Sequence, residues 1–136
     1  MRRGEMFRLR YGEGETGWAK WLGDGKARIA NLPISGLLNI DDVVEVVERE
    51  DRLEIARVVS SVFACRTTVA YPEPFERNYW TLRGALEALD CKVEGMVEGL
   101  AVVAHQESVN PVAVLKKLGL KLRVVGRARS KRSRVK

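Results

Sequence analysis

The stretch RTTVAYPEPFERNYWTLRGALEAL, residues 66–89, decides the fold because its rhythm changes in the middle. Arg66 to Tyr71 predicts a strand, and Pro72-Glu73-Pro74 ends it, since proline cannot continue a strand ladder. Apolar residues then recur every three or four positions, which is the spacing of one face of an α-helix. That apolar stripe consists of Phe75, Tyr79, Leu82, Leu86 and Leu89. We therefore predict an α+β fold.

Downstream of this helix, the pattern predicts two strands, a second helix and a last strand. The two strands lie at residues 92–97 and 100–106, and the last strand lies at residues 120–125. Asn110 is a good N-cap and Pro111 suits the first helical turn, so the second helix begins there. The resulting order, β-α-β-β-α-β, is typical of a ferredoxin-like domain.

Upstream, residues 5–61 predict a run of short strands. Apolar and basic residues alternate from Phe7 to Tyr11, which is the period of a half-buried strand. Gly23-Asp24-Gly25 predicts a tight hairpin, and Glu50-Asp51 predicts another turn. The expected strands are residues 7–11, 16–22, 26–30, 41–48 and 53–60. This spacing predicts a small sheet or open barrel of the SH3-like kind.

Positive charge is concentrated at the C-terminal end of the chain. The 136 residues carry a formal net charge of +6, but residues 121–136 hold eight basic residues and no acidic one. The remaining residues therefore carry a small net negative charge. A block of like charges repels itself and tends to stay disordered. We predict an SH3-like β-rich subdomain at residues 1–61, a ferredoxin-like subdomain at 62–125 and a disordered basic tail at 126–136.

Length and composition exclude several classes of protein. The longest apolar runs are four or five residues, too short for a transmembrane helix. A strand-like stretch follows Met1-Arg2-Arg3-Gly4-Glu5, so we expect no secretory signal. Cys65 and Cys91 are too few for a disulfide framework. We therefore predict a cytoplasmic protein, located in the host cytoplasm if a phage encodes it.

Residue types that carry catalysis are sparse and poorly spaced. His105 is the one histidine, and adjacent residues of a strand such as Glu107 and Ser108 point to opposite faces, so they form no triad with it. Cys65, Cys91 and His105 match no zinc-ligand spacing. We predict a protein that is not an enzyme, with no metal, no cofactor and a structural histidine.

Two further patterns favour turns over ligand sites. Gly12, Gly14 and Gly17 have the spacing of a dinucleotide-binding loop, but a predicted strand follows them where that loop needs a helix. Asp41-Asp42 has no third carboxylate at calcium or magnesium spacing. We expect a hairpin turn at the glycines and a solvated turn at the aspartates.

Aromatic and basic side chains are interleaved near the N-terminus. Trp18 and Trp21 are three residues apart on a predicted strand, so they point to opposite faces and we expect only one in the core. An exposed tryptophan beside Lys20 suits base stacking or a protein hot spot; alternatively, both tryptophans pack at the two edges of a small barrel. The candidate partner-binding residues are Arg8, Arg10, Trp18, Lys20 and Trp21.

The basic tail is a second candidate contact, for nucleic acid or for an acidic protein surface. The alternative is a solvated tail that only improves solubility. Its candidate residues are Arg127, Arg129, Lys131, Arg132, Arg134 and Lys136. The predicted central strands at residues 66–70 and 100–104 carry no aromatic residue in the middle, which counts against the base-stacking mode of RNA-recognition domains.

Several short sequences resemble a family of small bacterial and phage proteins that form a domain of unknown function. The matching pieces are Gly17-Trp18-Ala19, Asn31-Leu32-Pro33, Asp42-Val43-Val44, Leu86-Glu87-Ala88-Leu89, Cys91-Lys92-Val93-Glu94-Gly95 and Val114-Leu115-Lys116-Lys117-Leu118. They extend over most of the chain between Phe7 and Leu118. This resemblance implies no activity.

In size, basic ends and heat-adapted composition, the chain is also similar to a thermophilic-phage type of protein that binds host RNA polymerase. Asparagine and glutamine together number five, and arginine outnumbers lysine by 16 to 8. This resemblance implies binding near the flap of the β subunit, displacement of a σ-factor domain and antitermination. No signature residue matches, so no site residue follows from it.

Three functions therefore remain open from the sequence. The first is a non-enzymatic regulator that docks on a nucleic-acid-associated machine such as RNA polymerase. The second is direct, sequence-independent binding of DNA or RNA through the basic tail. The third is a small-ligand or enzymatic ferredoxin-like domain, which requires a concave pocket holding His105 or Cys65 beside a carboxylate.

Overall fold

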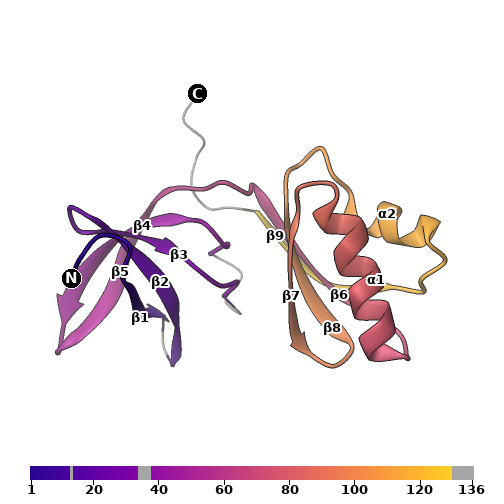
Figure 1. The fold of residues 1–136 in the computed structure, drawn as a ribbon, viewed down its shortest axis with the longest axis horizontal. Coiled ribbons are helices and arrows are strands. Elements are labelled where there is room, and N and C mark those ends of the chain that lie inside the picture. The colour runs from indigo at the N-terminus through magenta and orange to yellow at the C-terminus, as the bar shows by residue number, and fades with distance from the viewer. Residues whose placement is uncertain (13, 34–37, 130–136) are drawn as a thin grey trace. The chain divides into compact units, whose positions relative to one another are not determined.

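Two compact units make up the chain. The computed structural model describes residues 1–12, 14–33 and 38–129, which divide into a unit at Met1–Phe63 and a unit at Ala64–Arg129 (Figure 1). The first unit thus ends two residues beyond the predicted boundary at residue 61. No helix in these described ranges is long and apolar enough to cross a membrane.

The first unit is a closed barrel of five strands. In barrel order its strands are β1 (Met6–Gly12), β2 (Glu15–Gly23), β3 (Lys26–Ile29), β4 (Val43–Arg49) and β5 (Arg52–Ser60). Consecutive strands pair antiparallel, and a parallel bridge between β1 and β5 closes the barrel. The SH3-like barrel of the sequence prediction fits this arrangement.

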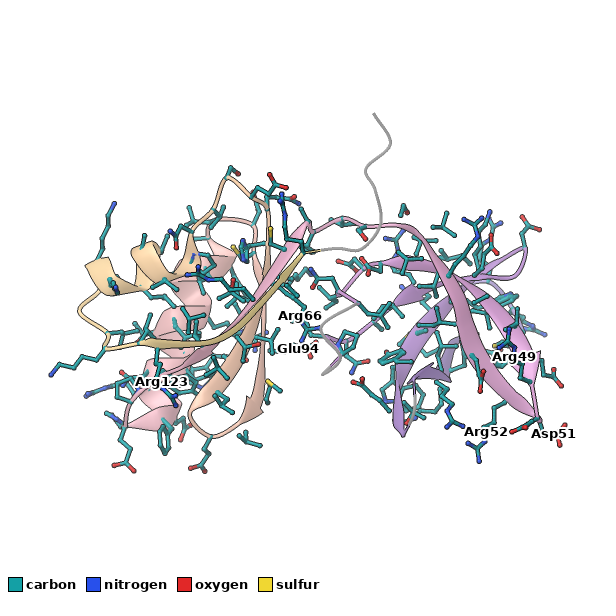
Figure 2. All side chains as sticks on the ribbon, turned by 180° about the vertical axis from the view of Figure 1, so that it is seen from behind. Arg49, Asp51, Arg52, Arg66, Glu94 and Arg123 are labelled. Atoms are coloured by element: carbon teal, nitrogen blue, oxygen red, sulfur yellow. The ribbon has the colours of Figure 1, made fainter. Side chains whose placement is uncertain are left out.

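The β4–β5 hairpin turns where the sequence predicts. Glu50 and Asp51 form a two-residue loop, and their φ angles are 51° and 61°. Two such left-handed residues are typical of a type I′ turn, whose twist matches that of the flanking strands. Figure 2 shows Arg49, Asp51 and Arg52 at the tip of this hairpin.

Strand alternation fills the barrel with apolar side chains. On β1, Phe7 and Leu9 point inward, and Leu9 is fully buried. Because successive residues of a strand face opposite sides, Arg8 and Arg10 point outward. The interior cluster consists of Phe7, Leu9, Ala19, Ala27, Ile29, Leu38 and Val44.

The second unit packs two helices on one face of a four-stranded sheet (Figure 1). Its elements are β6 (Cys65–Ala70), α1 (Phe75–Glu87), β7 (Lys92–Val97), β8 (Leu100–His105), α2 (Pro111–Lys117) and β9 (Arg123–Arg129). The sheet order is β7-β8-β6-β9, and all neighbouring strands pair antiparallel. As predicted, the Asn110 side chain caps α2 by accepting a hydrogen bond of 3.1 Å from the backbone N–H of Ala113.

The core of this unit lies between the helices and the sheet. Leu82 and Leu86 of α1 and Leu115 of α2 are fully buried against it. Leu89, the last residue of the predicted stripe, is instead 45% exposed. The helix ends at Glu87, and the backbone N–H of Cys91 bonds to the carbonyl of Leu86, so the chain has already turned away at Leu89.

Part of the predicted basic tail is in fact strand. The last strand begins at Arg123, later than the predicted residue 120, and continues to Arg129. It extends this far because the peptide groups of β6 pair along their whole length, with Thr67 opposite Arg127 and Cys65 opposite Arg129. The assignment of residues 126–129 to a disordered tail is therefore wrong. Lys131, Arg132, Arg134 and Lys136 lie outside the described residues.

Leu86 and Leu89 differ in burial, and this difference predicts unequal effects of their substitution on stability. Leu86→Ala should lower the free energy of unfolding by about 2–5 kcal/mol, because it removes a fully buried side chain and leaves a cavity. Leu89→Ala is the matched control and should cost less than about 0.5 kcal/mol. Urea denaturation of both variants measures the difference, and equal losses would contradict this packing of α1.

Candidate functional site

The outer surface of β1, β2 and β3 gathers four of the five predicted partner-binding residues. The antiparallel register places Arg8 opposite Trp18, Arg10 opposite Thr16, and Lys20 opposite Arg28. Residues opposite one another share a face of the sheet. We call this surface the basic face, and its members are Arg8, Arg10, Thr16, Trp18, Lys20 and Arg28.

At the centre of the basic face, an arginine stacks on a tryptophan. The Trp18 side chain is 46% exposed, and the guanidinium carbon of Arg8 lies 5.0 Å from the centroid of its ring. Arg8 also donates a hydrogen bond of 2.8 Å to the hydroxyl of Thr16. A cation–π contact at an exposed site contributes about 0.5–1 kcal/mol. Two contacts therefore hold Arg8 in one orientation beside the exposed indole.

The other basic side chains of this face differ in how they are held. Arg28 donates to the backbone carbonyl of Asp41 at 3.3 Å, and Arg10 lies 4.0 Å from a Glu54 carboxylate oxygen, which balances part of its charge. Lys20 is exposed. The basic face thus presents the guanidinium groups of Arg8, Arg10 and Arg28 and the exposed ammonium group of Lys20 around Trp18.

Trp21, the fifth predicted residue, is not part of this surface. It lies on the inner side of β2 and packs against the ring of Phe7, with the centroids 6.0 Å apart and the planes at 73°. The alternation of the strand sends Trp18 outward and Trp21 inward, so only one of these two tryptophans is exposed, as their spacing predicts. The inclusion of Trp21 among partner-binding residues is corrected accordingly.

The backbone of Trp18 is fixed by a small polar cluster at one end of the barrel. The Asn31 side-chain oxygen accepts a hydrogen bond of 2.9 Å from the Trp18 N–H, and the Tyr11 hydroxyl lies 3.1 Å from both that oxygen and the Trp18 carbonyl. A Cβ atom at Gly17 would overlap the hydroxyl and ring of Tyr11. An alanine at this position would therefore displace the Tyr11 side chain.

The turn at Asp41-Asp42 differs from the solvated turn that the sequence predicts. Asp42 is fully buried, and its carboxylate accepts a hydrogen bond of 2.8 Å from the backbone N–H of Asn39. The backbone of Ile29 donates to the Asp42 carbonyl at 2.9 Å, which ties the turn to β3. Burial of the side chain is tolerated because the carboxylate accepts a hydrogen bond from this backbone donor.

A pocket of about 340 Å³ lies at one end of the sheet in the second unit. It contains His105, Cys65 and Glu107, the combination that a small-ligand or enzymatic site would require. Cys65 lies opposite His105 in the β6–β8 register and opposite Arg129 in the β6–β9 register. Arg127 and Arg129, predicted for the tail, line this pocket instead. We call it the His105 pocket.

His105 is paired on both ring nitrogens. Its Nδ1 lies 2.8 Å from the backbone carbonyl of Gln106, which accepts hydrogen bonds only, so Nδ1 carries the proton. Nε2 lies 2.8 Å from the Thr67 hydroxyl, and in the neutral tautomer it accepts a hydrogen bond from that hydroxyl. Both side chains are buried, at 7% and 3% exposure. Thr67 was missed in the sequence because only the register of distant strands brings it to His105.

The remaining chemical groups stay apart. Ser108 is exposed, and Glu107 forms an ion pair with Arg129. Cys91 is buried beside Leu86 and Val93, and burial, followed by the negative charge of Asp90, raises the pKa of its thiol. Within the described ranges, no three His, Cys, Asp or Glu side chains cluster closely enough to hold a metal ion.

A closed SH3-like barrel followed by an α+β unit with a four-stranded sheet defines the class of fold. The crystal structure of a hypothetical protein from Neisseria gonorrhoeae is similar over 90% of this chain and 94% of its own, with a TM-score of 0.58 and 14% sequence identity. At this identity the similarity establishes the fold alone. No protein-family model and no curated protein sequence matches the chain, so both sequence resemblances stay predictions.

The close approach of the Tyr11 ring to Gly17 predicts a strong energetic coupling between substitutions at these two residues. Gly17→Ala should lower the free energy of unfolding by about 1–3 kcal/mol, because the added methyl group displaces the Tyr11 ring. In a Tyr11→Ala background the same substitution should cost much less, since the overlapping ring is gone. Chemical denaturation of the four proteins of this double-mutant cycle measures the coupling. Additive losses would show that Tyr11 does not occupy the space above Gly17.

Proposed function

We propose that this protein is a non-enzymatic binding module whose basic face contacts single-stranded nucleic acid. The Arg8–Trp18 pair carries this proposal. An exposed indole offers a stacking surface to any base, and a neighbouring guanidinium offers donors to a phosphate. Lys20 and Arg28 lie next to the pair on the same outer surface and extend its positive charge along the strands.

Two features favour binding over catalysis in this proposal. On the basic face, the described side chains offer donors and an aromatic ring, but no base beside a nucleophile. In the His105 pocket, the imidazole is oriented by a backbone carbonyl and not by a carboxylate, unlike the base of a catalytic triad.

The fold class and the location form part of the same proposal. We assign the second unit to the ferredoxin-like class, which its β-α-β-β-α-β order and the sheet order β7-β8-β6-β9 support. We place the protein in the cytoplasm, because two cysteines, Cys65 and Cys91, are too few for the disulfide framework of a small secreted protein.

Fluorescence anisotropy with a labelled oligothymidine of about 16 nucleotides tests the nucleic-acid proposal. Trp18→Ala should weaken binding by about 1–3 kcal/mol, the contribution of one base stacked on an aromatic ring. Lys20→Gln should reduce the slope of log K against log salt by about 0.7, because one phosphate contact is lost.

Trp80→Ala is the matched control, since Trp80 of α1 is also exposed and also lies under an arginine, Arg83, at 5.2 Å. It should leave the affinity unchanged. Deletion of residues 130–136 tests the tail separately and keeps β9 complete. If this deletion abolishes binding while Trp18→Ala has no effect, the tail is the binding element and the basic face is not.

A second candidate function, docking on a protein such as RNA polymerase, is favoured by an apolar groove on the second unit. The groove, of about 660 Å³, lies between α1 and the β7–β8 hairpin. Trp80, Met96 and Val97 along it are 57%, 38% and 63% exposed. Exposed apolar surface of this kind is typical of protein interaction sites.

Pull-down from a bacterial host lysate, with mass spectrometry of the RNA polymerase subunits, tests the docking function. The wild-type protein should retain polymerase subunits, and Val97→Glu should lose them because a charge enters the apolar contact. Trp18→Ala serves as the control and should retain them. Recovery of no polymerase subunit by the wild-type protein would exclude this partner.

A further inference from the structure

The His105 pocket has the size and the construction of a small-molecule site. Its volume of about 340 Å³ lies at the lower end of the range for such sites. Strand register brings groups from β6, β8 and β9 together there, although they are up to 64 positions apart in the sequence. Because these groups lie on paired strands, the sheet fixes their spacing.

The lining of the pocket has an apolar side and a polar side. Val109, Pro111 and Val112, at the start of α2 and just before it, supply the apolar side. Thr67 and His105, together with the arginines of β9, supply the polar side. We propose that this pocket binds a small organic anion, a carboxylate or phosphate group carried on a compact apolar body.

The positive charge of Arg127 is the reason that we propose an anion as the ligand. It lies opposite Thr67 in the β6–β9 register, so both side chains leave the sheet on the pocket side. Arg129 already pairs with Glu107, whereas no carboxylate in the part of the chain that the structure describes forms an ion pair with Arg127. A guanidinium group matches the two oxygens of a carboxylate or phosphate with two parallel hydrogen bonds.

The Thr67–His105 pair makes the inner part of the pocket polar. Nδ1 of His105 donates to the backbone carbonyl of Gln106, and Nε2 is hydrogen-bonded to the Thr67 hydroxyl. The hydroxyl oxygen keeps a lone pair that can accept from a donor on the ligand. The anionic end of the ligand belongs at Arg127, which lines the pocket and forms no ion pair with a described carboxylate, and its apolar body belongs against Val109 and Val112.

This site is independent of the proposed nucleic-acid function, because every residue of it belongs to the second unit. Cys65 lines the pocket and provides an intrinsic reporter of occupancy. Cys91 is buried outside it with a raised thiol pKa, so it reacts slowly and serves as an internal reference.

The experiment measures alkylation of Cys65 by iodoacetamide in the wild-type protein, with peptide mass spectrometry and constant ionic strength. Benzoate and phenyl phosphate are the probes, and they distinguish a carboxylate from a phosphate ligand. A bound probe slows alkylation by the factor 1 + [L]/Kd, which is about tenfold when the probe concentration is about nine times its Kd. Protection by either probe, at an unchanged rate for Cys91, supports the proposal.

Matched controls separate the pocket from general charge effects. Arg127→Gln should abolish protection, while Arg123→Gln, which removes the same charge at the other end of β9, should keep it (Figure 2). Benzyl alcohol lacks the charge and inorganic phosphate lacks the apolar body, so both should protect less. The amide NMR shift of Thr67 upon benzoate addition gives a second readout that needs no substitution.

Four results would overturn the proposal. They are the absence of protection by both probes at tens-of-millimolar concentration, equal protection by benzyl alcohol, equal protection by inorganic phosphate, and undiminished protection in a folded Arg127→Gln variant. None of these results bears on the affinity for oligothymidine, so failure here is distinguishable from failure of the proposed function.

Discussion

Antiparallel strand register is the constraint on which both candidate sites depend. Side chains alternate with a period of two, so a slip of one residue would move every side chain to the other face of its sheet. In the barrel, the pairing of Arg8 with Trp18 places the guanidinium over the indole. In the second unit, the pairing of Thr67 with Arg127 brings an arginine of the last strand to the His105 pocket.

Local patterns were sufficient to predict most elements of the fold. The alternation from Phe7 to Tyr11 predicted that Arg8 and Arg10 of β1 point outward. The turn between β4 and β5 lies at Glu50-Asp51, as the sequence predicted. The spacing of Trp18 and Trp21 predicted that one of them enters the core. It could not say which one, because that choice depends on the interior of a barrel whose strands pair across long sequence distances.

Non-local pairing explains what the sequence could not predict. The run of basic residues alone predicted a disordered tail from residue 126. Residues 126–129 instead form part of an edge strand, because their backbone groups pair with those of β6. Charged side chains are common on edge strands, so basic composition is a weak argument against one. The prediction of a solvated turn at Asp42 was wrong for a related reason. The charge of the side chain suggested exposure, but a carboxylate that accepts a hydrogen bond from a backbone N–H can be buried.

The rigidity of the basic face has an energetic consequence for binding. A long side chain loses about 0.5–1.5 kcal/mol of rotamer freedom when a partner immobilises it. Arg8 has already lost part of that freedom to Thr16 and Trp18, and the Trp18 backbone is held by Asn31. Lys20 keeps its freedom and loses it only on binding. If the basic face binds nucleic acid as proposed, the oriented pair therefore costs less entropy to engage than an equal number of lysines.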